Sequence, residues 1–251
     1  MLLGRVHFLP DTVQAARLRG GVAVVIDLLR ATTTVCHALA AGAAEVRPCL
    51  EIDEARFLAA RLGRERCILG GERSGVRIEG FDCGNSPSEY TRERVAGKTL
   101  VFTTTNGTRA IGRVLAADRI LLGSLANLSA VCGQIARQLA TLDIVCAGTD
   151  GGVTREDVLV AGAIVDRLTA ANDEAAWQWN DEALIARDAW RAMASGNNFS
   201  QTLLAALRDS RGGRNLVELG YDADIVTAAE VDSLSVVPEV LRGDDGMQIV
   251  G

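Results

Sequence analysis

The chain has 251 residues, enough for one large domain or two small ones, and its 26 basic and 32 acidic residues give a net charge of −6. This acidic balance argues against a nucleic-acid binder and against binding to an anionic membrane, because both depend on clustered cations. The longest apolar run, 22–26, is too short for a bilayer span, and no export signal is visible, so we expect a cytoplasmic protein. Six cysteines without a CxxC pair favour reduced, buried side chains over disulfides or a structural zinc site.

Short apolar runs alternate with longer helical patterns. The expected strands are Val22–Ile26, Glu45–Pro48, Arg66–Leu69, Thr99–Phe102, Arg119–Leu122 and Asp143–Ala147. The expected helices are Thr33–Ala41, Ile52–Leu62, Thr108–Ala116, Leu125–Leu139, Val158–Leu168 and Glu174–Ala194. This alternation predicts an α/β fold, three-layer α/β/α with a mainly parallel sheet, in one domain covering 1–251. The part after about Ala170 is expected to be mostly helical, with a turn at 243–246.

Polar segments follow four of these strands. In open parallel sheets, ligands bind where strands reach their carboxyl ends. We therefore expect four segments to converge on one site: 24–34, 70–89, 103–109 and 146–157.

The first segment places a carboxylate at the end of a buried strand. Asp27 suits a hard-cation ligand or a nucleophile, and Arg30 can grip an oxyanion with two hydrogen bonds. Thr32 and Thr33 supply hydroxyls at the start of a helix, where anions bind. The alternative interpretation is plain helix capping with a local ion pair between Asp27 and Arg30.

The second segment is rich in glycine, which lets backbone approach a ligand closely. Glu72 and Asp82 are candidate oxygen ligands, and Arg73 is a second candidate anion grip. Asn85 and Ser86 precede a proline, a pattern typical of a helix start, and are candidates for substrate binding. A surface loop of turn residues is the alternative.

The last two segments offer hydroxyls, amides and acids. The third predicts an anion cradle formed by Thr105, Asn106, Gly107 and Thr108. In the fourth, Thr149 is a candidate substrate contact, and Asp157 a candidate metal ligand. Helix capping, and acids that favour a helix N-terminus, would explain the same residues without a ligand.

The combined set suits Mg²⁺ held by carboxylates together with a doubly anionic substrate. Its candidate metal ligands are Asp27, Glu72, Asp82 and Asp157, and its candidate catalytic residues are Asp27, Arg30, Glu72 and Asp82. Two histidines suit zinc poorly. No P-loop, dinucleotide-binding glycine motif or nucleophile elbow is present.

These segments resemble the 2-phosphosulfolactate phosphatase family, the ComB-like proteins. The matching stretches are VVIDLLRATTT, GGERSG, GFDCGNSPSE, TTTNGT, CAGTDG with its trailing ED, and NLVELGYDADI with the later VP. The resemblance implies an α/β/α fold, a homodimer and Mg²⁺-dependent hydrolysis of (2R)-O-phospho-3-sulfolactate to (2R)-3-sulfolactate and phosphate, a step of coenzyme M biosynthesis.

Three alternatives accompany this hypothesis. The protein acts on a related small phospho-acid, or it is a non-catalytic anion-binding module on the same fold, or it transfers phosphate from a nucleotide. The absence of a P-loop disfavours the last. The sequence also leaves two routes for hydrolysis, through an aspartyl phosphate at Asp27 or by direct attack of water.

Overall fold

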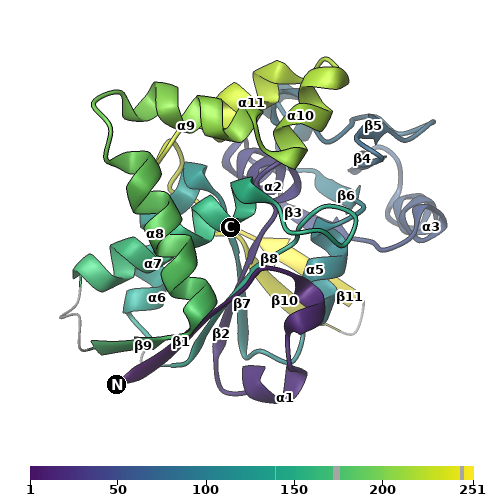
Figure 1. Ribbon diagram of the computed structural model, residues 1–251. Helices are drawn as coiled ribbons and strands as arrows, with labels where there is room; N and C mark the ends of the chain where they lie inside the picture. The colour runs from purple at the N-terminus through teal and green to yellow at the C-terminus, as the bar shows by residue number, and fades with distance from the viewer. Residues whose placement is uncertain (139, 172–175, 244–245) are drawn as a thin grey trace.

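The computed structural model describes residues 1–138, 140–171, 176–243 and 246–251 and shows an α/β protein built on a large mixed sheet (Figure 1). The strands are β1 (Leu2–His7), β2 (Val22–Ile26), β3 (Glu45–Pro48), β4 (Cys67–Arg73), β5 (Val76–Arg77), β6 (Thr99–Thr103), β7 (Arg119–Gly123), β8 (Leu142–Cys146), β9 (Trp177–Trp179), β10 (Glu239–Gly243) and β11 (Gly246–Val250). The α-helices are α1 (Ala15–Leu18), α2 (Ala31–Ala40), α3 (Ile52–Leu62), α4 (Arg92–Val95), α5 (Gly107–Arg113), α6 (Leu128–Ala136), α7 (Arg155–Ala171), α8 (Asp181–Ala194), α9 (Phe199–Arg208), α10 (Arg211–Glu218) and α11 (Asp222–Ala228). Short 3₁₀ helices are η1 (Pro10–Thr12), η2 (Pro87–Glu89) and η3 (Leu125–Asn127).

The sheet consists of two parallel sets joined by a hairpin. Its order is β5-β4-β6-β3-β11-β10-β7-β2-β8-β1-β9. Strands β7, β2, β8, β1 and β9 are parallel to one another, and β3, β6 and β4 form a second parallel set. The short edge strand β5 is antiparallel to β4. The hairpin β10–β11 lies between the sets and is antiparallel to β7 on one side and to β3 on the other. The expectation of a mainly parallel sheet is therefore confirmed in part.

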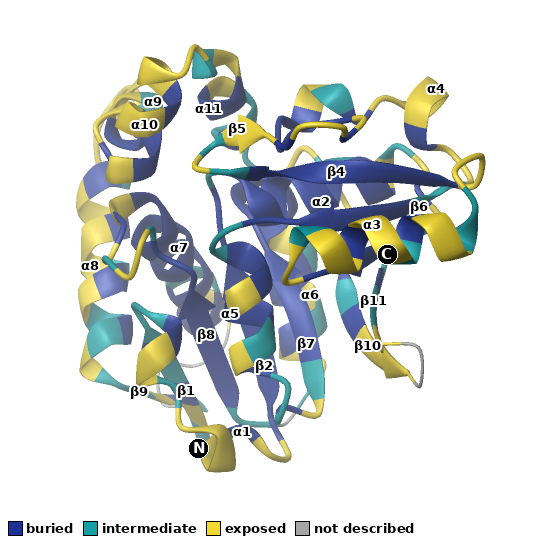
Figure 2. Cartoon of the chain, turned by 90° about the vertical axis from the view of Figure 1, so that its right-hand side faces the viewer, coloured by how far each residue is buried: buried dark blue, intermediate teal, exposed yellow. Residues whose placement is uncertain are grey.

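The hairpin changes how the two sets are oriented. Three successive antiparallel pairings separate β7 from β3, so the two parallel sets run in opposite senses through the sheet order. Because sheets twist, strands far apart in the order need not lie in one plane. Figure 2 shows β4 and β6 crossing the direction of β2, β7 and β8. The carboxyl ends of β2 and β4 can then approach one another, as the site described below requires.

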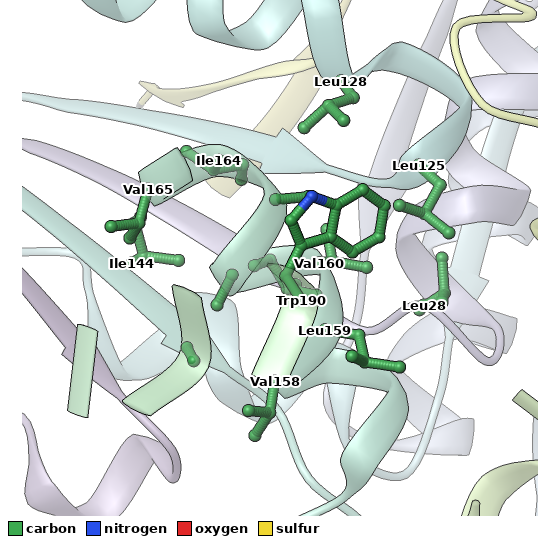
Figure 3. Packing of buried hydrophobic residues seen from close by; sticks show 14 of the residues in the cluster. Leu28, Leu125, Leu128, Ile144, Val158, Leu159, Val160, Ile164, Val165 and Trp190 are labelled. Carbon is green, nitrogen blue, oxygen red and sulfur yellow. The ribbon is translucent and has the colours of Figure 1, made fainter. Parts of the chain in front are cut away.

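Apolar side chains cover both faces of the first set. Along β2, Val22, Val24 and Ile26 belong to the cluster that includes residues of α6, α7 and α8, whereas Ala23 and Val25 belong to the cluster that includes residues of α2 and α5. This alternation follows from the two-residue period of a strand, and it explains why β2 is apolar throughout. Figure 3 shows the first cluster, in which Trp190 of α8 lies among Leu159 and Val160 of α7.

The C-terminal part is more mixed than expected. Helices α8 to α11 are present, and Figure 1 shows α9, α10 and α11 gathered above the sheet. However, 177–179 forms strand β9 where a helix was expected, and β10 and β11 were not expected at all. Leu139 and Glu174, at the ends of two expected helices, and the middle of the expected 243–246 turn lie outside the described residues.

The state of the cysteines and the character of the helices can be compared directly with the structure. All six cysteines are free and buried, which confirms their role as small core side chains. None of the helices in the described part of the chain combines the length and apolar character that a bilayer crossing requires.

Candidate functional site

Residues of all four predicted segments meet at one cavity of about 300 Å³. Residues of α10, which lies outside the four predicted segments, also line the cavity. The lining residues are Asp27, Leu29, Arg30, Glu72, Ser74, Gly75, Asn85, Thr105, Asn106, Thr149, Asp150, Gly212, Asn215, Leu216, Glu218 and Leu219. The predicted convergence is therefore observed, although a twisted mixed sheet produces it rather than one parallel edge.

Asp27 lies directly after β2 and is buried. Its Oδ1 accepts a hydrogen bond from the Ala31 N–H at 3.2 Å. The pKa of Asp27 is raised to about 7, mainly by burial and also by the neighbouring Glu72 and Glu156, against the lowering effect of the Ala31 N–H and of Arg30. The positive charge of Arg30 therefore offsets only part of the cost of ionising this carboxyl.

Glu72 is carried to the cavity by strand β4. The strand continues past Leu69 through Gly70 and Gly71 to Arg73, where a loop was expected. A β-carbon on Gly71 would lie 2.1 Å from the Thr103 carbonyl oxygen, so glycine is what lets β4 run this close to β6. Ser74 and Gly75, both with positive φ, then turn the chain back into β5.

The Glu72 carboxylate is fixed by backbone groups on both sides. Its Oε1 accepts the Thr105 N–H at 2.8 Å, and its Oε2 accepts the Gly75 N–H at 2.6 Å. Two separate loops thus orient one carboxylate.

Gly107 lies against Asp27 at the start of α5. A β-carbon built there would stand 2.8 Å from Oδ2 of Asp27 and 2.6 Å from the β-carbon of Ala31. No side chain fits between α5 and the carboxylate without displacing one of them. The predicted cradle residues Thr105 and Asn106 line the cavity beside it.

Several predicted substrate contacts are instead internal structural bonds. The Thr32 hydroxyl donates to the Asp27 carbonyl oxygen, and the Thr33 hydroxyl donates to that of Leu28. Thr108 is buried and bonds to Thr104. None of these three threonines lines the cavity. Each hydroxyl is thus already used by a nearby group of the chain, although neither α2 nor α5 has a side-chain hydrogen bond from its N-cap residue.

Two predicted charged residues do not reach the cavity. Asp82 pairs with Arg64 at 2.8 Å and also accepts the Leu69 N–H at 2.7 Å, so it fixes the loop beside β4 rather than facing the common mouth. Arg73 donates to the carbonyl oxygens of Leu50 and Glu72 and to the Thr103 hydroxyl. Neither residue is among those that line the cavity, since each side chain is held by local partners, and their roles at the site stay predictions.

Asp157 is buried beside the site but is also committed. Its Oδ1 accepts the Leu28 N–H at 2.9 Å and its Oδ2 the Gly148 N–H at 3.0 Å, so it joins the turns after β2 and β8. Burial, with Glu156 and Asp27 nearby, raises its pKa well above the ordinary value. It does not line the cavity, which argues against the predicted metal role.

The cavity is rich in negative charge. The acids Asp27, Glu72, Asp150 and Glu218 line it, and Arg30 is the one basic side chain among the described lining residues. An anionic substrate entering alone would be repelled by this set. A cation bound between the acids would remove that repulsion.

The donor set fits a hard divalent cation. Alongside Asp27 and Glu72, the Asn85 side chain lines the cavity, and its buried Oδ1 has no hydrogen-bond partner. Among the described residues, no three His, Cys, Asp or Glu side chains form a metal cluster. Two carboxylates and an amide oxygen are nevertheless a typical protein share for Mg²⁺, which keeps waters and binds substrate phosphates.

Helices α10 and α11 contribute residues to the site that were not predicted as site residues. Asn215, Leu216 and Glu218 of α10 line the cavity, and Asp224 of α11 pairs with Arg30 at 2.7 Å. Ser86, predicted to bind substrate, donates to Asp224 instead. The stretch 215–225 had already matched the family, and that match was the available signal for these helices.

Comparisons with known proteins identify the family that this chain resembles. The model of the 2-phosphosulpholactate phosphatase family matches residues 7–243. A protein of Symbiobacterium thermophilum named probable 2-phosphosulfolactate phosphatase is 44% identical over 230 residues, covering 91% of this chain and 95% of the relative. Proteins with the same name from Caldanaerobacter subterraneus (40% identical, 88% of each chain) and Synechococcus sp. (41% identical, 88% of this chain and 89% of the relative) are also similar.

Proposed function

The chain belongs to the 2-phosphosulfolactate phosphatase family, and from that premise we propose that it hydrolyses the phosphate monoester of 2-phosphosulfolactate with the help of Mg²⁺. The observation that carries the proposal is the shared cavity, in which Asp27, Glu72 and Arg30 face one space at the carboxyl ends of β2 and β4. The proposed reaction releases (2R)-3-sulfolactate and phosphate, as in coenzyme M biosynthesis.

The chain's residues divide into a cation-binding part and an anion-binding part. Asp27, Glu72 and Asn85 would hold Mg²⁺ with their oxygens, and Arg30 would bind phosphoryl oxygens. What bound Mg²⁺ supplies is positive charge against the phosphoryl group. Since phosphoryl transfer depends mainly on positioning and charge stabilisation, these groups account for most of the catalysis expected here.

The acidic lining also favours an enzyme over an anion-binding module. A module that only retained an anion would gain affinity by losing Asp27 and Glu72, whose charges oppose the ligand. Their presence in one buried wall is instead what a cation-assisted reaction needs.

Measurement of phosphate release tests the proposal. We expect (2R)-O-phospho-3-sulfolactate to be hydrolysed with Mg²⁺ and not with EDTA, and Asp27→Asn to lose at least ~100-fold in kcat/KM. Asp82→Asn is the matched control, because its carboxylate lies outside the cavity. Phospholactate, which lacks the sulfonate, and 2-phosphoglycerate test the related-substrate alternative. Absence of phosphate release from all three would refute the proposed activity.

A trapping experiment separates the two routes of hydrolysis. The oxygen that attacks phosphorus belongs either to water or to the Asp27 carboxylate. Borohydride added to a quenched single turnover reduces an aspartyl phosphate to homoserine, which peptide mass analysis locates. Homoserine at position 27 establishes the covalent route, and its absence under conditions that trap a known aspartyl phosphate favours water.

The remaining parts of the hypothesis have independent measurements. The homodimer implied by the family stays a prediction that light scattering on the purified protein measures. The cytoplasmic location is a prediction that cell fractionation measures.

A further inference from the structure

Arg30 is held from three directions by residues outside its own turn. One terminal nitrogen donates to Oδ2 of Asp224 at 2.7 Å, and the other donates to the Gly75 carbonyl oxygen at 2.8 Å. The guanidinium carbon lies 4.4 Å from the centre of the Tyr221 ring, within reach of a cation–π interaction. These partners belong to α11, to the β4–β5 turn and to the residue preceding α11.

The partner carboxylate is itself fixed. Oδ1 of Asp224 accepts a hydrogen bond from the Ser86 hydroxyl at 2.5 Å, and Ser86 lies 2.9 Å from the Ser88 hydroxyl. Each carboxylate oxygen therefore has its own partner from a different part of the chain. The side chains of Arg30 and Asp224 are 3% and 4% exposed, so the pair is almost completely withdrawn from water.

A buried ion pair of this kind is weak evidence for a stabilising role. The cost of removing both charges from water can equal or exceed their attraction, so stability alone does not explain why this pair is buried. Arg30 lines the same cavity as Asp27 and Glu72. Without a competing carboxylate, the guanidinium would be drawn toward those acids and would occupy the space needed by the cation and the phosphoryl group.

We propose that Asp224 is a positioning residue that acts through Arg30, keeping the guanidinium away from Asp27 and Glu72 and oriented toward the bound anion. A guanidinium has five N–H donors, and the Asp224 and Gly75 bonds use two of them. Three donors remain on a residue that lines the cavity. Ser86 contributes by fixing Asp224. The inference rests on the proposed function in taking a phosphoryl group as that anion.

A double-mutant cycle distinguishes positioning from a general structural role. We expect Asp224→Asn to lower kcat/KM about 30-fold and to weaken binding of inorganic phosphate, in the presence of Mg²⁺, about 10-fold. In the Arg30→Gln background, the same substitution should change either quantity less than about threefold, since the residue through which it acts is gone. Asp222→Asn is the control on the same helix, because Asp222 pairs with Arg208 at the surface, and it should match wild type.

Ser86→Ala is a milder variant that tests the inference even if the other variants fail to fold. It removes one hydrogen bond to Asp224 and leaves both charges in place, so we expect a three- to tenfold loss of kcat/KM in a folded protein. Equal effects of Asp224→Asn with and without Arg30 would overturn the inference, as would wild-type activity of a folded Ser86→Ala variant.

Phosphate binding, measured by calorimetry, separates this inference from the proposed function. If wild type binds phosphate but hydrolyses none of the three phospho-acids, the proposed activity fails while the cycle still measures coupling between Arg30 and Asp224. If wild type with Mg²⁺ does not bind phosphate, the inference fails, because Arg30 then holds no anion.

Discussion

Replacing Asp27 with asparagine should stabilise the metal-free protein, and more so as the pH rises. In the folded chain the pKa of this carboxyl is about 7, against an ordinary value of 3.8, mainly because of burial. At about 1.4 kcal/mol per pKa unit, ionising Asp27 costs the folded state ~4 kcal/mol. Because the pKa is raised on folding, the folded protein is spared this cost below about pH 4. The stability that depends on the protonated carboxyl is then lost as the pH rises through about 7.

Asparagine removes the charge and keeps an oxygen that can accept the Ala31 N–H. Its amide nitrogen, however, cannot accept hydrogen bonds, so we expect a net gain on the order of 2–3 kcal/mol at pH 8 rather than the full amount. At pH 5 the folded carboxyl is protonated but the unfolded one is ionised, which costs wild type about 1.6 kcal/mol. The same amide penalty offsets most of this, so the two proteins should differ by less than ~1 kcal/mol.

Urea denaturation in EDTA at pH 5 and pH 8 measures these differences, with Asp82→Asn as the control for loss of an acid beside the site. A stability difference for Asp27→Asn that is the same at both pH values would refute the reasoning. So would a variant that is less stable than wild type at pH 8, since the carboxylate would then be well compensated without a cation.

Three further predictions concern the neighbouring residues. Gly107→Ala should lower kcat/KM at least ~10-fold and destabilise the protein by about 1–3 kcal/mol, because the added methyl group would press on Asp27; full activity in phosphate release would contradict the crowding. Adding Mg²⁺ should raise the melting temperature of wild type at pH 8 in a thermal scan, and Glu72→Gln should abolish most of that rise. An undiminished rise in the variant would show that Glu72 does not bind the cation. Asp82→Asn should keep wild-type activity and lose no more than ~1 kcal/mol in urea denaturation, because its pair with Arg64 is partly exposed; a large loss of activity would return Asp82 to the site.

The parts of the fold that could be predicted are those whose environment is uniform along the chain. Strand β2 is apolar at every position because both of its faces are covered, and its bounds were predicted as observed. Strands β10 and β11 mix exposed and half-buried residues, and β9 has only three residues, so neither gave a readable pattern.

The site could be predicted only to the level of its segments. Acids at strand ends pointed to Asp27 and Glu72, because ligands bind where strands reach their carboxyl ends. That these two ends meet depends on the twist of a mixed sheet, which the sequence did not show. Whether an acid faces the cavity depends on competing partners, and the bonds of Asp82 to Arg64 and of Arg73 to backbone are set by loop geometry. The Asp224–Arg30 pair spans 194 residues of sequence, a distance over which a single sequence shows no pairing.

The hairpin β10–β11 has a consequence for local unfolding. In the sheet it is the link between the strand set that ends at Asp27 and the one that carries Glu72. Its place between the two sets rests on the pairings of Ile249 with Val46 and of Glu239 with Leu121. Opening of the hairpin would therefore loosen the two walls of the cavity from one another while leaving each parallel set paired within itself.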